Sequence, residues 1–183
     1  MHILFVGKCC PSHTINTIIQ KTGKNPGIQI VKFSRLILEG FVHNNSKVNV
    51  LSNIITEQAI FSRHHKECFE NIQYTYLPTI QVPIVCQLFY ILSSFIYTIK
   101  WALKTKGDKI ILCDIFANSS SKGSVAAAKL LNIPTCMMLT DMIAPPVTIA
   151  KDTSKWWWNI FFNLFVRSQR NSIKQYDGFV FLT

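Results

Sequence analysis

Short runs of apolar residues recur along the whole chain, and amphipathic segments separate them. Runs rich in Ile, Val, Leu, Phe and Cys, bounded by polar or turn-forming residues, are typical of buried β-strands. Six such strands are predicted: Ile3–Val6, Val48–Leu51, Ile72–Leu77, Lys109–Cys113, Thr135–Leu139 and Phe179–Leu182.

The segments between these runs show helical periodicity. Apolar side chains recur at a spacing of about 3.6 residues at Ile30, Phe33, Ile37, Leu38 and Phe41. Three further helices are predicted at Val82–Lys104, at Gly123–Leu131 and at about Trp156–Gln175. Ser119–Ser121 supply N-cap candidates for the helix at Gly123, and Asn132-Ile133-Pro134 ends it.

Strands that alternate with helices favour βαβ units, which build a parallel sheet covered on both faces. The 183 residues are enough for one domain, residues 1–183, and the 49% of hydrophobic against 15% of charged residues excludes a disordered chain. The predicted fold is α/β, a Rossmann-like open parallel sheet with helices on both faces. Such sheets bind ligands beyond the carboxyl ends of their strands.

Polar residues follow several predicted strands at that edge. Lys8, Asp114 and Asp141 each come after an apolar run, so we expect them to point into one cleft. The alternative is that the two aspartates only cap turns or helices. No Gly-x-Gly-x-x-Gly fingerprint or P-loop follows the first strand. A long loop, residues 8–27 with His13, is predicted there instead and indicates a large ligand.

The charge of the chain favours an anionic partner. Lys and Arg number 19 against 9 Asp and Glu, which gives a formal charge of +10. These basic residues are scattered over several helix ends rather than grouped with exposed aromatics, so no nucleic acid is expected. The six cysteines include no C-x-x-C pair and are interpreted as structural thiols of a cytoplasmic protein. No metal-ligand cluster is visible, so no metal is expected.

Two apolar segments leave burial and membrane contact as alternatives. Val82–Ile99 carries no charge and has about the minimum length of a membrane span, although Pro83 and Gln87 favour a buried or interface helix. Lys155–Arg170 has one narrow polar stripe, so either the core or an anionic membrane surface must cover the rest. The start, MHILFVG, is too short for a secretory signal and lacks a basic flank.

Several motifs occur in an order that is similar to one known family. Pro26-Gly27-Ile28-Gln29 stands at a helix start, and Asp114 is followed by a loop and by SVAAAKLLNIPT. The strands in CMMLTDM and DGFVFLT complete the series. In this order the whole chain resembles the N-terminal, acceptor-side domain of family 4 retaining glycosyltransferases, which have the GT-B fold. Pro26 departs from the family's Gly-Gly pair, and Thr140 stands where many members have His.

The resemblance implies an enzyme of two Rossmann-like domains with the active site between them. This chain is then the acceptor-binding half, inactive alone, and a C-terminal domain absent from it binds the nucleotide sugar. The implied reaction is retaining transfer of a hexosyl group to a lipid-linked or other membrane-associated glycan acceptor, in polysaccharide or glycoconjugate biosynthesis, with no metal or other cofactor. The expected location is the cytoplasm, peripherally on the inner face of the cell membrane. The alternative is a non-catalytic Rossmann-like subunit that binds a partner or recruits it to a membrane.

The resemblance also assigns candidate site residues. Thr140 and Asp141 fall at the sugar-transfer point and are the catalytic candidates. A Gly at a helix start lets the backbone approach a phosphate closely, so Gly27 is expected at the diphosphate. The remaining candidates for donor-phosphate or acceptor contacts are Asn25, Gln29, Lys8, His13, Asp114 and Asn118.

Overall fold

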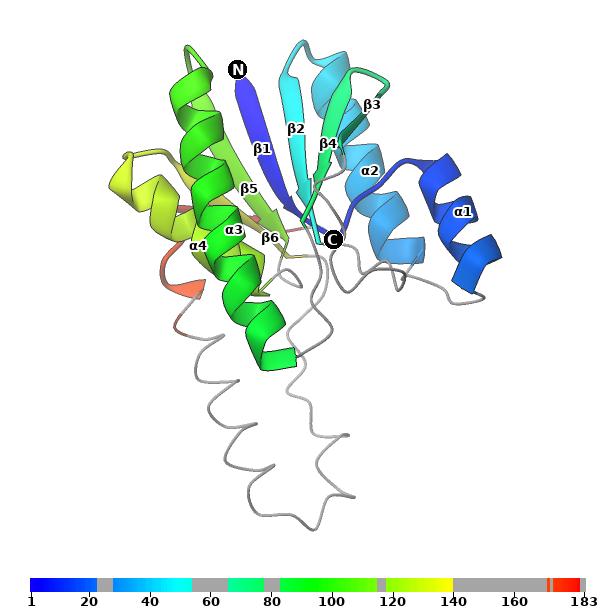
Figure 1. Ribbon diagram of the computed structural model, residues 1–183. Helices are drawn as coiled ribbons and strands as arrows, with labels where there is room; N and C mark the ends of the chain where they lie inside the picture. Colours follow the sequence, from blue (N-terminus) through cyan, green and yellow to red (C-terminus); the bar gives the residue numbers. More distant parts are fainter. Residues whose placement is uncertain are drawn as a thin grey trace.

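The sheet is the centre of the fold, seen here in a computed structural model that describes residues 1–22, 28–53, 66–77, 83–114, 118–139, 171 and 173–181. These residues form a seven-stranded sheet of order β3-β4-β2-β1-β5-β6-β7 (Figure 1). The strands are β1 His2–Gly7, β2 Lys47–Ser52, β3 Lys66–Phe69, β4 Ile72–Tyr76, β5 Lys109–Asp114, β6 Thr135–Leu139 and β7 Gly178–Phe181. Neighbouring strands are parallel except for β3 and β4, which are antiparallel.

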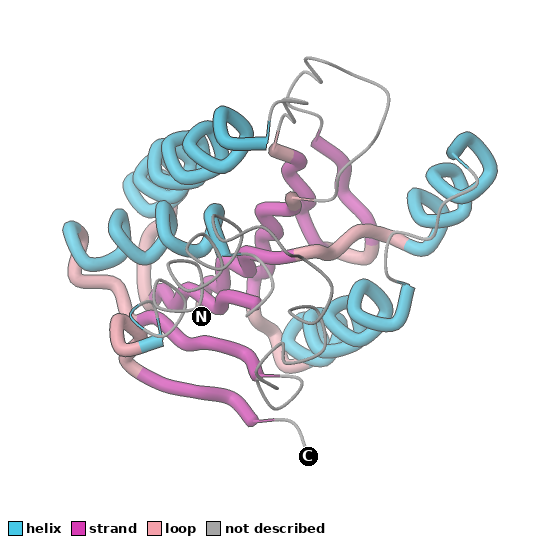
Figure 2. Tube along the Cα trace, turned by 90° about the horizontal axis from the view of Figure 1, so that it is seen from below, coloured by secondary structure: helices cyan, strands magenta, loops and turns pink. Residues whose placement is uncertain are grey.

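Helices cover both faces of this sheet. The described helices are α1 Ser12–Thr22, α2 Ile28–His43, α3 Pro83–Lys104 and α4 Asn118–Leu130. The pair α1 and α2 lies on one side of the sheet, and α3 and α4 lie on the other (Figure 2). The chain therefore has an α/β, Rossmann-like fold, as the alternation of strand and helix patterns predicts. All six predicted strands are present, and β6 has the predicted bounds.

Two elements correct the sequence-based expectation. Residues 8–27 are predicted as one long loop, but α1 occupies Ser12–Thr22 and buries Ile15 against Val31 of α2. Threonine and asparagine have low helix propensity, and they obscure the helical pattern of this segment. The short edge strand β3 is also unexpected, and it makes the sheet mixed rather than wholly parallel. Its turn to β4 consists of Glu70 and Asn71, with φ of 50° and 62°, as a two-residue type I′ hairpin requires.

Helix α4 begins earlier than predicted and ends at Leu130, one residue before its predicted end. It starts at Asn118 rather than Gly123, so Ser119–Ser121 lie in its first turn instead of capping it. Asn132 follows the helix with φ of 52°, and Ile133 N donates a hydrogen bond to Ala128 O over 2.9 Å, an arrangement typical of a helix C-terminus. The helix predicted at about Trp156–Gln175 lies almost entirely outside the described residues.

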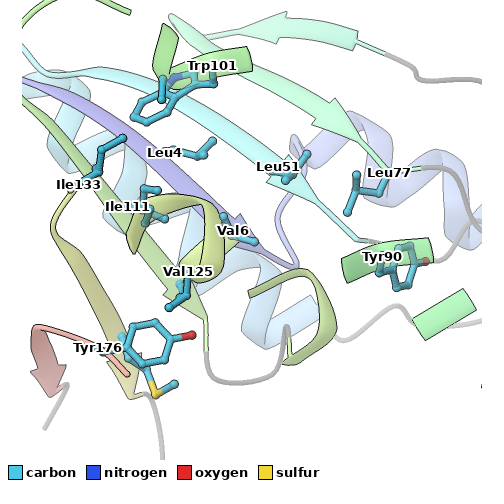
Figure 3. Close-up of a cluster of buried hydrophobic side chains, with 14 of the residues drawn as sticks. Leu4, Val6, Leu51, Leu77, Tyr90, Trp101, Ile111, Val125, Ile133 and Tyr176 are labelled. Atoms are coloured by element: carbon cyan, nitrogen blue, oxygen red, sulfur yellow. The ribbon is translucent and has the colours of Figure 1, made fainter. Parts of the chain in front are cut away.

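Separate apolar cores fill the two faces. Figure 3 shows the core under α3 and α4, where Leu4 and Val6 of β1 lie beneath Trp101 of α3 and Val125 of α4. On the opposite face, Phe5 of β1 belongs to a second core, under α2. Because β1 is covered on both sides, its side chains alternate between the two cores. Full burial of each such side chain contributes about 1.5–3 kcal/mol.

Helices α3 and α4 pack closely because small residues lie between them. A Cβ atom on Gly123 would lie 2.0 Å from the carbonyl oxygen of Ile91. Thr98 Oγ1 donates a hydrogen bond to Ser124 Oγ over 3.0 Å in the same buried interface. Within the described residues, α3 contains one segment, Val85–Lys104, that is long and apolar enough to cross a membrane, with mean hydropathy 1.2 and 33% of it buried. Packing against α4 and the sheet accounts for the inner side of that segment.

Candidate functional site

The strand order reverses at β1 and β5, so a ligand crevice is expected at the carboxyl ends of these strands. From β1 the sheet extends to β2 and β4 on one side, and to β5, β6 and β7 on the other. Open α/β sheets bind ligands at the point where the strand order reverses in this way. Helices α2 and α4 run back along the sheet to the starts of β2 and β6, so both begin at this same edge (Figure 1). Helix N-termini there favour negative charge.

Gly7 and Asp114 meet at the reversal point. Gly7 ends β1, and a Cβ atom on it would lie 2.6 Å from Asp114 Cβ. The absence of a side chain at Gly7 therefore allows β1 to end beside the aspartate. Asp114 ends β5 with 1% of its surface exposed, and Ser121 Oγ donates a hydrogen bond to its carbonyl oxygen over 3.4 Å. Lys8, partly exposed, follows directly after Gly7.

A second buried polar group lies at the end of β2. Asn53 follows β2 and is 8% exposed. Its Nδ2 donates a hydrogen bond over 3.3 Å to Ser120 Oγ in the first turn of α4. Within the described part of the chain, Asn53 Oδ1 is buried without a hydrogen-bond partner. An acceptor left in this state costs about 1–3 kcal/mol, and a ligand hydroxyl would remove that cost.

A third polar group joins α1 to the β3–β4 hairpin. Glu67 of β3 accepts hydrogen bonds from Thr14 Oγ1 over 3.1 Å and from the hydroxyl of Tyr76. His13 Nε2 lies 3.3 Å from Glu67 Oε2, and the His13 ring centroid is 5.3 Å from that of Phe69. Burial, followed by the hydrogen bond to Glu67, raises the pKa of Tyr76 above its ordinary range. The tyrosine therefore stays protonated and acts as a donor.

The thiols near this edge are packing groups. Burial, with Glu67 as the next cause, raises the pKa of Cys10 to about 12, and burial raises the pKa of Cys9 well above its ordinary value. Burial also raises the pKa of Cys113, next to Asp114, to about 12. A nucleophilic cysteine needs a lowered pKa, so none of these three residues is suited to attack a substrate. All six cysteines are free, and four of them are buried.

The structure brings only part of the predicted site together. Lys8 directly follows β1, and Asp114 ends the adjacent strand β5. Asn118 begins α4 at the same edge. Gln29 is exposed in the first turn of α2. His13 belongs to the Glu67 group, toward the β3 side of the sheet. The other candidates lie outside the described residues and stay predictions: Asn25, Gly27, Thr140 and Asp141.

The structure adds two functional candidates, Asn53 and Glu67, that are not among the residues predicted from the sequence. Asn53 comes shortly after the apolar run Val48–Leu51, so the rule that selected Lys8 and Asp114 also selects it. Glu67 lies in a strand of four residues with mostly polar neighbours, and no periodic signal marks such a short edge strand.

Among the described residues, no group of three or more His, Cys, Asp or Glu is arranged to hold a metal ion. Comparison with protein-family models, with curated proteins and with solved structures gave no match to this chain. The chain is thus defined by its class, an α/β Rossmann-like protein with polar residues at the strand-order reversal, where a ligand crevice is expected. Its function has to be argued from that crevice.

Proposed function

We propose that this chain is the acceptor-binding half of a retaining hexosyltransferase and that a second domain binds the nucleotide sugar. The observation that carries the proposal is the row of polar groups at the ends of β2, β1 and β5, namely Asn53, Lys8 and Asp114. Two buried oxygen-bearing side chains beside a lysine suit a ligand with several hydroxyl groups and an anionic group. A phosphorylated glycan precursor has this chemistry.

The order of elements supports the same proposal. The motifs of the family 4 resemblance fall on β1, the start of α2, the end of β5 with α4, β6 and β7. In a GT-B enzyme these elements surround one crevice, which the second domain closes. The family's fold is Rossmann-like in each half, and the fold of this chain agrees with it at that level.

Each polar group has its own role in this proposal. Asn53 Oδ1 and the Asp114 carboxylate accept hydrogen bonds from acceptor hydroxyls, and Lys8 neutralises the acceptor's phosphate. The N-terminus of α2, with Gln29, Asn25 and Gly27, stabilises the departing nucleotide diphosphate. Thr140 and Asp141 contact the sugar as it is transferred, and His13 makes a further acceptor contact. No metal or other cofactor is required for these roles.

A membrane-associated acceptor is favoured by the outer side of α3. Large apolar side chains that are 42–73% exposed recur there every third, fourth or seventh residue and so form one stripe: Val85, Leu88, Leu92, Ile96 and Leu103. Lys100 and Lys104 lie at one end of this stripe. An apolar stripe bordered by lysines suits an anionic membrane surface. We therefore propose a peripheral location on the inner face of the cell membrane.

The same stripe favours a second candidate, a non-catalytic subunit that recruits a partner to the membrane. The two candidates differ in whether the crevice binds an acceptor. Calorimetric titration with a soluble short-chain prenyl diphosphate sugar separates them. For the enzyme we expect Lys8→Ala and Asn53→Ala each to weaken binding at least about tenfold. Lys129→Ala, which removes an exposed lysine at the far end of α4, should leave binding unchanged.

The outcomes are distinct. Loss of binding in the two crevice variants, with unchanged thermal melting, supports acceptor binding at this edge. If the protein binds no acceptor but sediments with phosphatidylglycerol vesicles through Leu88 and Leu92, the recruiting subunit is the correct candidate. If Lys8→Ala and Asn53→Ala bind the acceptor as tightly as the unchanged protein, the crevice has been placed wrongly.

A further inference from the structure

A basic cavity lies at a different place in the fold from the crevice. It has a volume of about 800 Å³ and opens between the C-terminal half of α3 and the face of β1, β2, β3 and β4 on that side. His2 and Lys47, at the starts of β1 and β2, line one end of it. The crevice lies at the opposite ends of these strands, so the cavity is a second site. Its volume is in the range of small-molecule sites, about 300–1,000 Å³.

The charge of this cavity is of one sign. No Asp or Glu is among its described lining residues, and five lysines are: Lys47, Lys66, Lys100, Lys104 and Lys106. These lysines come from two strands, one helix and the turn after it, so folding brings together charges that are distant in the sequence. Lysines held in one concave site repel one another, and an anion in the site relieves the repulsion.

The lowered pKa of His2 is consistent with a positive electrostatic potential in the cavity. Burial is the first cause that lowers the pKa of His2, and the charges of Lys47, the N-terminal amine and Lys109 follow. Without a bound anion the imidazole is therefore mostly neutral at pH 7, and its N–H can donate a hydrogen bond to a ligand.

The floor of the cavity is built from hydrogen-bonded polar side chains. Trp101 Nε1 donates to Asn49 Oδ1 over 3.1 Å, and Asn49 Nδ2 donates to Gln73 Oε1 over 2.7 Å. Thr75 Oγ1 and Tyr97 OH are 3.1 Å apart and share a further hydrogen bond. These contacts fix the orientation of the floor before any ligand arrives, so little conformational freedom is lost on binding.

Polar floor residues stand at positions where the same sheet face is otherwise apolar. Leu51 is fully buried two residues after Asn49, and Leu77 is 1% exposed two residues after Thr75. Since alternate residues of a strand share a face, the sheet changes from apolar to polar where the cavity opens. Gln73 uses its oxygen in the bond to Asn49, so its amide nitrogen is the group that can donate to a ligand.

We propose that this cavity binds a small ligand that carries two or more linked phosphate groups. Lysine binds phosphate as a point charge on a flexible stem, and all five cations that line the cavity are lysines. A diphosphate or triphosphate supplies a compact charge close to that of the lysines. The polar floor then contacts the part of the ligand that bears the phosphates. This inference stands independently of the proposed acceptor site.

Titration with inorganic tripolyphosphate at low salt tests the proposal. We expect saturable binding with one site, and the double variant Lys100→Gln/Lys104→Gln should weaken it at least about tenfold, because it removes two of the five positive charges that line the cavity. The control is Lys129→Gln/Lys174→Gln, which removes the same charge from exposed positions outside the cavity. This control should change the affinity less than about twofold, which is the size expected of exposed charges at a distance.

The remaining arms identify the source of the phosphates and separate this site from the crevice. Tripolyphosphate binding without a preference for phosphorylated inositol lipid over phosphatidylglycerol, in vesicles of equal charge, indicates a soluble ligand. A preference for the inositol lipid that tripolyphosphate abolishes indicates a lipid headgroup. Lys8→Ala should not alter tripolyphosphate binding, whatever it does to the acceptor. Equal weakening in the cavity and control variants, no saturable binding, or tighter binding of a single-stranded oligonucleotide than of tripolyphosphate would each overturn the proposal.

Discussion

The end of β1 and the end of β5 are so close that a Cβ atom on Gly7 would lie 2.6 Å from Asp114 Cβ. Two ring carbons of Phe5 would lie 2.8 Å from this added Cβ atom of Gly7. Real Cβ atoms do not approach other carbons this closely, because the repulsion rises steeply inside van der Waals contact. Glycine at position 7 is therefore a condition for placing a carboxylate beside the strand-order reversal.

The first prediction follows from this contact. Gly7→Ala should lower the free energy of unfolding by about 1–3 kcal/mol, since an extra methyl group in a packed site forces neighbouring atoms to move. Urea denaturation followed by circular dichroism measures the change. If the proposed acceptor site is correct, the displaced Asp114 should also weaken acceptor binding.

Gly40 provides the matched control. It lies within α2, and nothing within 4 Å would meet an added Cβ atom. Gly40→Ala should raise the free energy of unfolding by about 0.5–1 kcal/mol, because alanine loses less conformational entropy in a helix. If Gly7→Ala were as stable as Gly40→Ala, the close approach of β1 and β5 would not exist in solution.

The pattern of apolar residues predicts most of this fold because burial on both faces leaves a strong signal. Strands such as β1 and β6 are continuous apolar runs, and burial against both cores requires them to be so. Edge elements carry no such requirement. β3 has alternating exposed and half-buried residues, and α1 buries a single side chain fully among its described positions, Ile15. Both elements make contacts with residues distant in the sequence, such as the hydrogen bond from Thr14 to Glu67, which a local pattern cannot show.

The candidate site is predicted less completely, for a related reason. The rule that ligands bind at the carboxyl ends of parallel strands finds Lys8 and Asp114 from the sequence. The roles of Asn53 and Ser120 depend on a hydrogen bond between residues 67 positions apart, which requires the fold. The basic cavity cannot be predicted from any local pattern, because its lysines come from separate elements that only the fold brings together.

A second prediction concerns the contact between α3 and α4. An alanine usually stabilises a helix relative to glycine by about 1 kcal/mol, but a Cβ atom at position 123 would lie 2.0 Å from the carbonyl oxygen of Ile91 and 2.2 Å from Ser94 Oγ. Backbone cannot move aside as a flexible side chain can. Gly123→Ala should therefore lower the melting temperature, opposite in sign to Gly40→Ala. A rise in melting temperature for both variants would contradict the packing of these helices.

Thiol reactivity gives a third prediction. Cys68 is exposed, whereas Cys9, Cys10, Cys86 and Cys113 are buried. Burial raises the pKa of Cys10 and of Cys113 to about 12, so both stay as unreactive thiols at pH 8. Ellman's reagent should modify Cys68 rapidly and the four buried residues only after denaturation, with Cys136 reacting at an intermediate rate. Cys68→Ser should abolish the fast phase, and a fast phase that persists in this variant would contradict the burial of the others.

The last prediction concerns how low pH affects the hydrogen bonds between Thr135 of β6 and Asp177, which precedes β7. Asp177 Oδ2 accepts hydrogen bonds from Thr135 N and from Thr135 Oγ1, each over 2.8 Å. The backbone bond first, and the side-chain bond second, hold the pKa of Asp177 below its ordinary value. A carboxyl group whose folded pKa is lowered stabilises the fold above the unfolded pKa, about 3.9, and this stabilisation is lost as the pH falls through the folded value. Because Asp177 is exposed, solvent keeps its contribution below about 1 kcal/mol.

Asp177→Asn should therefore lower the free energy of unfolding at pH 7 and leave it less changed at pH 2, where the aspartate is already protonated. Thr135→Val keeps the backbone donor to Asp177 but removes the hydroxyl donor. The free energy of unfolding should therefore fall less on acidification in this variant than in the unchanged protein. Urea denaturation at several pH values between about 2 and 7 measures both variants. An equal loss of stability for Asp177→Asn at pH 2 and pH 7 would mean that the charged form of Asp177 does not hold β7 against β6.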